Sequence, residues 1–234
     1  MGKYKSISFV FPMFNEADNI GDTVKRAESL AAELTDDYEI VVADDASTDG
    51  SGDIIDKLAS ANPHVKSVRL KTNMKFGGAL KEGLKNASKD IVIYTDSDFP
   101  AKEDDIKKAL GMLKDADIIS AYSLVIKDSS LKRIVMSKVY NFLVRFLFGL
   151  KLRDINSGLK IYKQEAIKGL LLRSKSPFID VEIFSEASKR NMKIKQYGLI
   201  FDLRTGGVST ISRMSVVART FWDMIAYKLS LFGR

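Results

Sequence analysis

Residues 91–100 have the sequence IVIYTDSDFP, an apolar run that ends in two carboxylates one residue apart. The β-branched and aromatic residues at 91–94 predict a buried strand that ends at Thr95. Open α/β sheets bind their ligands at the carboxyl ends of strands, which is where Asp96 and Asp98 would lie. Mg²⁺ prefers oxygen ligands and is usually held by one or two carboxylates together with substrate phosphates. The pair therefore predicts a clamp for a divalent cation and a diphosphate, with a solvated acidic loop as the alternative.

Strand-like and helix-like patterns alternate on both sides of this stretch. Runs of β-branched residues predict the strands, and apolar residues spaced three and four apart predict the helices between them. Repeated strand–helix units of this length imply the α/β class, with a mainly parallel sheet that helices cover on both faces. The strands are expected at residues 6–12, 39–43, 65–70, 91–95 and 117–122, and the helices at 20–34, 53–61 and 104–113, with one more that opens at 77–79 within the stretch 73–83.

Acidic or glycine-bearing turns follow three of these strands and would meet at one edge of the sheet. Asp44 and Asp45 begin a polar turn that ends at Gly50, a composition suited to the start of the next helix. Gly77 and Gly78 open a later helix, where small residues let a ligand or another backbone come close. The dinucleotide fingerprint G-x-G-x-x-G is absent from the sequence, so a nicotinamide-dependent enzyme is not expected.

The second half of the chain contains two long segments that mix apolar and basic residues. Residues 131–150 predict a helix that is strongly apolar in its second half but interrupted by Arg145, which argues against a membrane span. Residues 214–232 predict another helix, with Trp222 and Tyr227 of the types enriched at membrane interfaces. Helices lying in the lipid headgroup layer are expected, the alternative being amphipathic helices packed on the sheet or on a partner subunit. A helix at 178–190 and an extended segment at 193–201 lie between them.

Charge divides the chain into an acidic half and a basic half. Residues 1–122 contain 16 Lys and Arg against 22 Asp and Glu, and residues 123–234 contain 21 against 8, so net charges of −6 and +13 make up the total of +7. The basic half predicts an anionic partner, either a nucleic acid or an anionic membrane. No nucleic-acid-binding signature is evident, so nucleic acid is not the expected partner. The chain has no Cys, which excludes disulfides and thiolate chemistry.

The ordered motifs resemble those of the family 2 glycosyltransferases, which are inverting enzymes of the GT-A fold. The first half carries VFPMFNEADNI, VVADDASTDGS, NMKFGGALKEGL and YTDSDFP. The second half carries SLKRIVMSKVYNFL, RDINSGLKIYKQEAI, FIDVEIFSEASKRNMKI and FDLRTGGVS, which resemble the branch of dolichyl-phosphate mannose synthase and its bacterial polyprenyl-phosphate relatives. The resemblance covers nearly all of residues 6–210, and its specificity comes from several motifs in family-like order.

This resemblance implies a role for each matching residue. Asp96 and Asp98 would hold Mg²⁺ or Mn²⁺ on the diphosphate of a nucleotide-sugar donor, and Arg204 would help to stabilise the departing diphosphate. The residues implied in nucleotide binding are Pro12, Asn15, Glu16, Asp44, Asp45, Gly77 and Ser97. Those implied in binding the phosphate of the acceptor are Lys132, Arg133 and Ser137. The D-x-x-S-G element contains Asp154, Ser157 and Gly158, and the R-x-x-G-x-S loop ends in Ser209.

The chain departs from the pattern of the branch in two places. Ala121 stands where an Arg is common, so one phosphate contact would be missing or would come from Lys127, Lys132 or Arg153. Phe99, Pro100, Ala101 and Lys102 follow the acidic pair, where the branch usually has His or Gln before prolines.

The function implied is inverting transfer of a hexose, mannose first and glucose second, from a nucleotide sugar to a polyprenyl (dolichyl-type) phosphate. The catalytic domain would span residues 1–212, including the interface helix at 131–150, and residues 213–234 would form a C-terminal amphipathic helix. The chain is expected at the cytoplasmic face of the membrane, either as a peripheral protein or as a piece of a membrane-anchored one. For the peripheral form, association into a homodimer is an open alternative. The alternatives are a family 2 enzyme acting on a sugar hydroxyl, with Asp154 or Asp180 as base, and a non-catalytic nucleotide-sugar binding protein.

Overall fold

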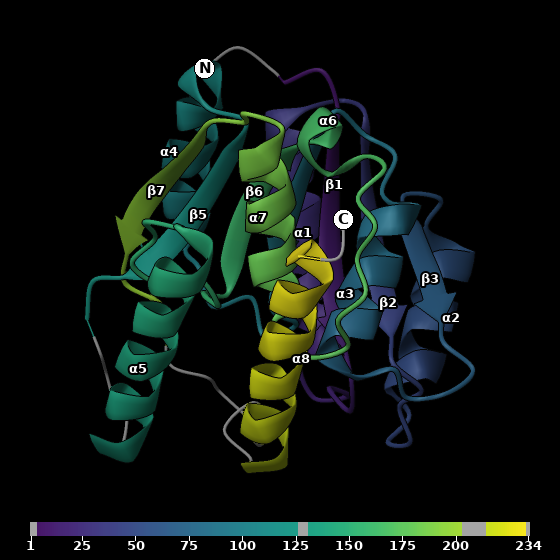
Figure 1. The fold of residues 1–234 in the computed structure, drawn as a ribbon. Helices are drawn as coiled ribbons and strands as arrows, with labels where there is room; N and C mark the ends of the chain where they lie inside the picture. Colours follow the sequence, from purple (N-terminus) through teal and green to yellow (C-terminus); the bar gives the residue numbers. More distant parts are fainter. Residues whose placement is uncertain (1–3, 126–130, 203–213, 233–234) are drawn as a thin grey trace.

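The computed structural model describes residues 4–125, 131–202 and 214–232, with only the backbone described at 131–133, 214 and 232. Seven strands form one sheet in the order β3-β2-β1-β4-β6-β5-β7 (Figure 1). Among these described strands only β6 runs against the others, since it is antiparallel to both β4 and β5. The strands are β1 (Ile7–Met13), β2 (Tyr38–Asp44), β3 (Val65–Arg69), β4 (Ile91–Thr95), β5 (Ile118–Ser123), β6 (Leu159–Lys163) and β7 (Ile194–Leu199). The expected α/β class with a mostly parallel sheet is confirmed.

Helices cover both faces of this sheet. Successive residues of a strand point to opposite faces, so each face carries its own apolar cluster. Phe9 and Phe11 of β1 pack with residues of α1, α2 and α4, whereas Val10 packs with residues of α3, α5, α7 and α8. The helices are α1 (Ile20–Leu34), α2 (Ser51–Ala61), α3 (Lys75–Asn86), α4 (Glu103–Gly111), α5 (Leu131–Phe148), α6 (Gln164–Ile167), α7 (Ile179–Lys189) and α8 (Met214–Phe232). A 3₁₀ helix at Met112–Asp115 extends α4.

The sequence patterns did not predict strand β6, which lies between β4 and β5. Its sequence LKIYK places Lys160 among apolar residues, and this charge interrupts the continuous apolar run expected of an interior strand. In the structure the Lys160 side chain is fully buried and the strand is completely enclosed up to Tyr162. The strand matters for the site because its first residue pairs with Thr95, directly before the acidic pair.

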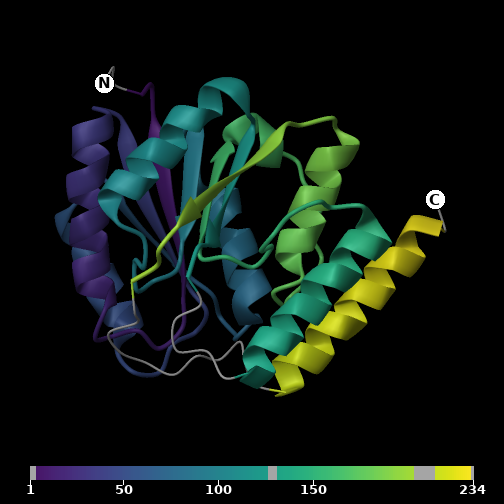
Figure 2. The ribbon, with the colours of Figure 1, turned by 90° about the vertical axis from the view of Figure 1, so that its left-hand side faces the viewer.

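Helices α5 and α8 extend past the edge of the sheet at which the parallel strands end (Figures 1 and 2). They meet each other near their carboxyl ends, where the Lys228 ammonium donates a hydrogen bond to the Leu147 carbonyl and the rings of Phe148 and Tyr227 lie 5.9 Å apart. Met224 of α8 is buried in the same cluster as α3 and α7. None of the helices within the described ranges has the length and apolar character needed to span a bilayer.

Candidate functional site

The acidic pair lies at the centre of the sheet edge. Asp96 and Asp98 follow β4, which has β1 on one side and β6 on the other, and both side chains are half-buried. The Phe99 N–H donates to the Asp96 carbonyl at 2.9 Å and closes a turn, while the Ser97 carbonyl accepts a 2.7 Å hydrogen bond from the Thr23 hydroxyl of α1. Both carboxylates therefore stand on a loop that is tied to the core and still open to solvent.

Phe99 anchors this loop by inserting its ring into the core. The ring is buried against Phe9 and Phe11, and the guanidinium of Arg26 lies 4.4 Å from its centroid. The backbone of Phe99 is left-handed, with φ of 46°, a conformation that is unfavourable for a bulky residue unless packing maintains it. The departure from the family pattern at this position thus has a packing role, because Phe99 fills the core beneath the acidic loop.

Asp96 has defined contacts on two sides. Its Oδ1 accepts a 2.9 Å hydrogen bond from the hydroxyl of Tyr94, a buried residue of β4, and its N–H donates to the Gly158 carbonyl at 3.3 Å. Burial, and then the charge of Asp96, raise the pKa of Tyr94 well above its usual value, so the hydroxyl keeps its proton and remains a donor. A Cβ at Gly158 would lie 2.5 Å from Asp96 Oδ2, so a side chain there would displace this carboxylate from its present position.

The residues present fit a divalent cation bound together with a substrate. Asp96 and Asp98 offer hard oxygen donors, and Gly158 leaves a space for Asp96 that any side chain would fill. Within the described residues no third His, Cys, Asp or Glu joins them to complete a protein-only site. Mg²⁺ and Mn²⁺ sites of this kind take their remaining ligands from substrate phosphates and water.

The loops that follow β1 and β2 are joined to each other. The backbone of Asn15 donates to Ser47 Oγ at 2.9 Å, and the Asn15 side-chain carbonyl accepts from the Thr48 N–H at 2.9 Å. The buried Glu16 donates its N–H to Ser51 Oγ at 2.8 Å. The structure thus brings together two motifs expected at the nucleoside, and Pro12 lies beside them in β1, paired with Ala43.

Asp44 and Asp45, although adjacent, have different partners. Asp44 is fully buried, accepts from the Ser47 N–H at 3.0 Å and has Arg69 Nε 3.5 Å from its Oδ2. Asp45 accepts a hydrogen bond from the Met74 N–H. Burial raises the pKa of Asp45 to about 6, against the lowering effect of the Met74 and Lys75 N–H groups. Arg69, which no motif pointed to, connects Asp44 to α2 through Asp53 and Asp56.

Gly77 is close to protein backbone. A Cβ there would lie 2.6 Å from the Ser174 carbonyl oxygen and 2.8 Å from that of Ser176, and the Gly77 N–H donates to the Lys175 carbonyl at 3.0 Å. Of the two reasons considered for a small residue here, approach of a ligand or of another backbone, the structure supports the second. The role of Gly77 in nucleotide binding stays a prediction.

The D-x-x-S-G loop is tied to helix α5. Asn141 of α5 accepts a 3.2 Å hydrogen bond from the Ile155 N–H, and its amide donates to the Ser137 carbonyl at 2.9 Å. Ser137 is exposed, one turn before Asn141, and Ser157 is buried. Ser137, expected at the acceptor phosphate, thus lies one helical turn from Asn141, and Asn141 contacts the loop beside Asp96.

Asp180 is sealed inside the protein. It is 1% exposed and its Oδ2 lies 3.0 Å from the ammonium of Lys160, which is itself fully buried. Burial raises the pKa of Asp180, Lys160 opposes that shift, and the negative charges of Asp96 and Asp154 add to it. No sequence motif pointed to Lys160, although a charged residue between the apolar residues Leu159 and Ile161 was an available signal.

Five predicted residues lie outside what the structure describes. They are Lys127, Arg204 and Ser209, and the side chains of Lys132 and Arg133. The chain that leads to Arg204 does reach the acidic loop, because the Asp202 N–H donates to the Pro100 carbonyl at 2.8 Å. Of the residues considered as substitutes for the missing Arg at Ala121, Arg153 is described, and its guanidinium lies 4.5 Å from the centroid of the Tyr122 ring.

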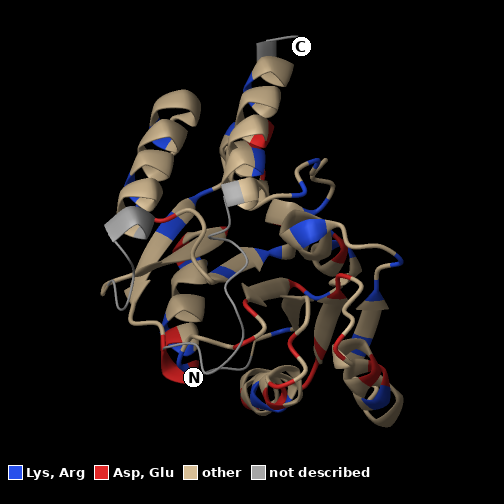
Figure 3. Ribbon diagram, turned by 90° about the horizontal axis from the view of Figure 1, so that it is seen from below, with Lys and Arg blue, Asp and Glu red and all other residues tan. Residues whose placement is uncertain are grey.

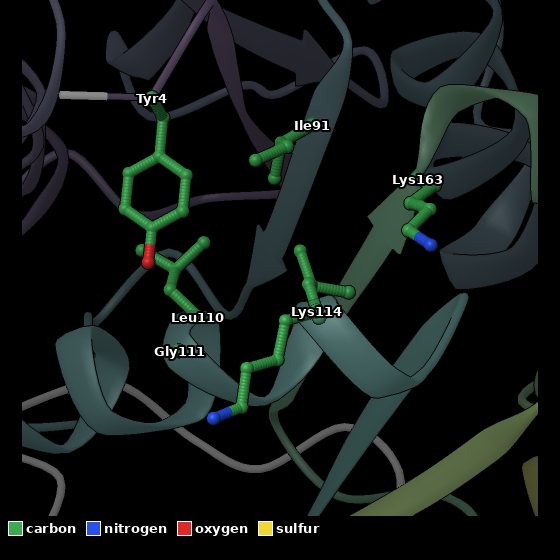
Figure 4. Close-up of a pocket in the computed structure, with 7 residues that line it drawn as sticks. Tyr4, Ile91, Leu110, Gly111, Lys114 and Lys163 are labelled. Atoms are coloured by element: carbon green, nitrogen blue, oxygen red, sulfur yellow. The ribbon is translucent and has the colours of Figure 1, made fainter. Parts of the chain in front are cut away.

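A surface depression elsewhere on the sheet is separate from this site. It is lined by Tyr4, Ile91, Leu110, Gly111, Leu113, Lys114 and Lys163 (Figure 4). Ile91 is the first residue of β4, whereas Asp96 follows the last, so the depression and the acidic pair lie at opposite ends of the strand. The depression contains none of the residues predicted for the site.

Known proteins resemble this chain in both sequence and fold. It is 30% identical over 179 residues to an undecaprenyl-phosphate 4-deoxy-4-formamido-L-arabinose transferase of Pseudomonas fluorescens, covering 75% of this chain and 52% of that protein. It is 27% identical over 232 residues to glycosyltransferase AglD of Haloferax volcanii, covering 93% of this chain and 37% of that protein. The chain therefore spans between about a third and about a half of the length of these relatives.

Solved glycosyltransferases share the fold. Glucosyl-3-phosphoglycerate synthase of Mycobacterium tuberculosis, in complex with Mn²⁺, UDP and glucosyl-3-phosphoglycerate, superposes with a TM-score of 0.70 at 19% identity, covering 96% of this chain and 80% of that one. The mannosyltransferase PcManGT of Pyrobaculum calidifontis, in complex with GDP-Man and Mn²⁺, superposes with a TM-score of 0.66 at 19% identity. The match covers 95% of this chain and 65% of that one. The fold is the Rossmann-like GT-A fold. Residues 8–171 match the family model described as glycosyl transferase family 2, and the chain belongs to that family.

Proposed function

We propose that this protein transfers a hexose from a nucleotide-diphosphate sugar to a polyprenyl phosphate at a membrane surface. The observation that supports this most is the position of Asp96 and Asp98 directly after the end of β4. Helices α5 and α8 extend past the same edge of the sheet (Figures 1 and 2). The undecaprenyl-phosphate substrate in the name of the Pseudomonas fluorescens relative supports the acceptor class. The catalytic part would be residues 1–212, with 213–234 as a C-terminal interface helix.

In this proposal Asp96 and Asp98 bind a divalent cation, Mg²⁺ or Mn²⁺, which supplies Lewis-acid stabilisation of the departing diphosphate. Asp96 is oriented by Tyr94 and Gly158, and Arg204 would add positive charge to the donor phosphates. The joined loops of β1 and β2 would bind the nucleoside through Asp44 or Asp45. Attack from the face opposite the diphosphate would invert the anomeric carbon.

The acceptor would approach from the basic side of the molecule. A phosphate oxygen is already anionic near neutral pH and needs no strong general base, so the protein must chiefly bring two anions together. Lys132, Arg133 and Ser137 on α5 would bind the acceptor phosphate while the lipid tail stays in the bilayer. The expected location is the cytoplasmic face of the membrane, and association of two copies through the terminal helices stays a prediction.

Transfer to a sugar hydroxyl is the competing activity, and it requires a carboxylate base. Asp180 is poorly suited to that role because it is buried and paired with Lys160, out of reach of an acceptor in solvent. Asp154 is half-buried, so a hydroxyl acceptor would have to depend on it. The burial of Asp180 therefore favours the phosphate acceptor.

The activity is tested by offering radiolabelled GDP-mannose, UDP-glucose or UDP-N-acetylglucosamine with polyprenyl phosphate and extracting the products into organic solvent. Label in the organic phase is expected, with GDP-mannose as the first donor and UDP-glucose as the second. Label only in water-soluble glycan would favour the hydroxyl acceptor. No turnover with any donor would favour a binding protein that retains the fold.

The metal site is tested by Asp98→Ala. We expect kcat to fall by at least about a hundredfold, because the stabilisation that the cation supplies is worth several kcal/mol, with little change in the thermal unfolding temperature. Asp104→Ala is the matched control, since Asp104 is an exposed carboxylate near the start of α4. Full transfer by Asp98→Ala would remove the metal assignment.

A further inference from the structure

A buried charge pair lies beneath the acidic pair and has no place in the function proposed so far. The ammonium of Lys160 in β6 lies 3.0 Å from Asp180 Oδ2 of α7 and donates a 2.7 Å hydrogen bond to the Ser157 carbonyl. Both side chains are closed to solvent, at 0% and 1% exposure. A buried charge is costly unless it is paired and hydrogen-bonded, so this arrangement holds β6, α7 and the 154–158 loop in one relative position.

Tyr94 connects this pair to Asp96. The Lys160 ammonium lies 5.0 Å from the centroid of the Tyr94 ring, within the range of a cation–π contact. The hydroxyl at the other end of the ring donates the 2.9 Å hydrogen bond to Asp96 Oδ1. Asp180, Lys160, Tyr94 and Asp96 therefore form a continuous series of contacts from the interior of the protein to the sheet edge.

The 154–158 loop limits Asp96 from its other side. Lys160 binds this loop at the Ser157 carbonyl, and the next residue, Gly158, accepts from the Asp96 N–H and leaves the space occupied by Oδ2. A carboxylate with one oxygen bound and the other limited by backbone has few rotamers left. Metal ligands oriented in this way bind more tightly, because the entropy of ordering them is lost on folding and not on binding.

We infer that Tyr94 is a positioning residue that fixes Asp96 for the divalent cation, and that the Lys160–Asp180 pair holds Tyr94 and the 154–158 loop in the arrangement this requires. The inference rests on the proposed function, which makes Asp96 a metal ligand. It assigns a role to three buried residues that act through Asp96.

Tyr94→Phe tests the role of the hydroxyl. The variant keeps the ring over Lys160 and removes only the donor to Asp96. The matched control is Tyr162→Phe, because Tyr162 of β6 is equally buried and its hydroxyl has no hydrogen-bond partner among the described residues. Mn²⁺ binding is measured by electron paramagnetic resonance of the free ion, with Mn²⁺ alone and with Mn²⁺ plus GDP or UDP, and thermal unfolding of the metal-free proteins is measured alongside.

We expect Tyr94→Phe to weaken Mn²⁺ binding by about tenfold, the lower end of the effect seen for residues that orient metal ligands. Tyr162→Phe should leave Mn²⁺ binding within twofold of the wild type. Equal Mn²⁺ binding by the wild type and Tyr94→Phe would overturn the positioning role while leaving the metal site in place. No Mn²⁺ binding by the wild type under any of these conditions would overturn the proposed function as well, so the two failures are distinguishable.

The charge pair is tested by the double variant Lys160→Met/Asp180→Leu. Removing Lys160 alone would leave Asp180 buried without its counter-charge and could prevent folding, whereas apolar replacement of both partners is often tolerated. We expect the double variant to unfold at a temperature close to that of the wild type yet to bind Mn²⁺ several-fold more weakly. A folded double variant with wild-type Mn²⁺ binding would limit the pair to a structural role and overturn that part of the inference.

Discussion

The carboxylates at the sheet edge show how strongly environment differentiates identical side chains. Asp44 is bound to Arg69, Asp45 is buried beside backbone N–H groups, and Asp96 is oriented by a tyrosine hydroxyl. All three lie at or directly after the ends of parallel strands. Their partners come from β3, the residue before α3 and the interior of β4, so the differences between them arise from tertiary contacts.

Asp45 makes stability depend on pH in a defined direction. Its pKa is about 6 in the folded protein and 3.8 in an unfolded chain, so the folded state binds more protons between these values. Its contribution to the free energy of unfolding is therefore complete at low pH and is lost as the pH rises toward 6. Asp45→Asn lacks this titration and keeps an oxygen that can accept from the Met74 N–H.

We expect the stability of Asp45→Asn relative to the wild type to increase by on the order of 2 kcal/mol between pH 4 and pH 7.5. Urea unfolding at four pH values across this range measures the difference. Parallel pH profiles for the two proteins would show that Asp45 remains well solvated in the folded state.

At the scale of elements, the start of helix α3 packs directly on the segment before α7. Gly77 has no space for a side chain, because the carbonyls of Ser174 and Ser176 lie against it. The same segment contacts α8, since the Ser174 hydroxyl donates to Asp223 at 2.6 Å. One tight backbone approach therefore connects the start of α3 with the C-terminal helix.

Gly77→Ala is expected to lower the free energy of unfolding by about 1–3 kcal/mol, because the added methyl forces two backbone segments apart. Gly21→Ala is the matched control: Gly21 lies in α1 with nothing within 4 Å of the added Cβ, and the change should stabilise the protein by up to about 1 kcal/mol. Urea unfolding compares the two variants. If Gly77→Ala were as stable as the wild type but lost nucleotide binding, the glycine would serve the ligand.

At the scale of the whole molecule, charge and apolar surface are distributed unevenly. Acidic residues gather near the strand ends, while α5 carries basic residues and no acidic ones (Figure 3). Exposed apolar side chains also concentrate on α5 and α8, where Phe146 of α5 is 77% exposed and Trp222 of α8 is 68% exposed. Aromatic and basic residues on exposed helices favour contact with an anionic bilayer, which agrees with the proposed acceptor.

We expect the double variant Phe146→Ser/Trp222→Ser to bind vesicles containing phosphatidylglycerol several-fold more weakly than the wild type, with the same thermal unfolding temperature. Leu171→Ser is the control, since Leu171 is 76% exposed but lies between α6 and α7. Wild-type binding should also fall as NaCl rises from 0.1 M to 1 M, because the Debye length shortens from about 10 Å to about 3 Å. Sedimentation with the vesicles measures both effects. Vesicle binding that changes neither with the double substitution nor with NaCl would exclude the exposed surface of α5 and α8 as the membrane contact.

The sequence by itself determined the alternation of strands and helices, the position of the acidic pair after β4 and the family. These properties follow from local patterns, since apolar periodicity and ordered motifs lie within short stretches of chain. It determined α8 at Met214–Phe232 and β4 at Ile91–Thr95 to the residue.

Only the tertiary structure decided which buried groups support the site. The antiparallel pairing of β6 with β4 and the approach of Gly158 to Asp96 join segments more than 60 residues apart in the chain, and the burial of Lys160 against Asp180 joins β6 to α7. Pairing between distant segments leaves no periodic pattern in the sequence, and a buried lysine looks like a surface residue until its counter-charge is known. For that reason the position of the carboxylates at the sheet edge was predictable, whereas the contacts that orient Asp96 were not.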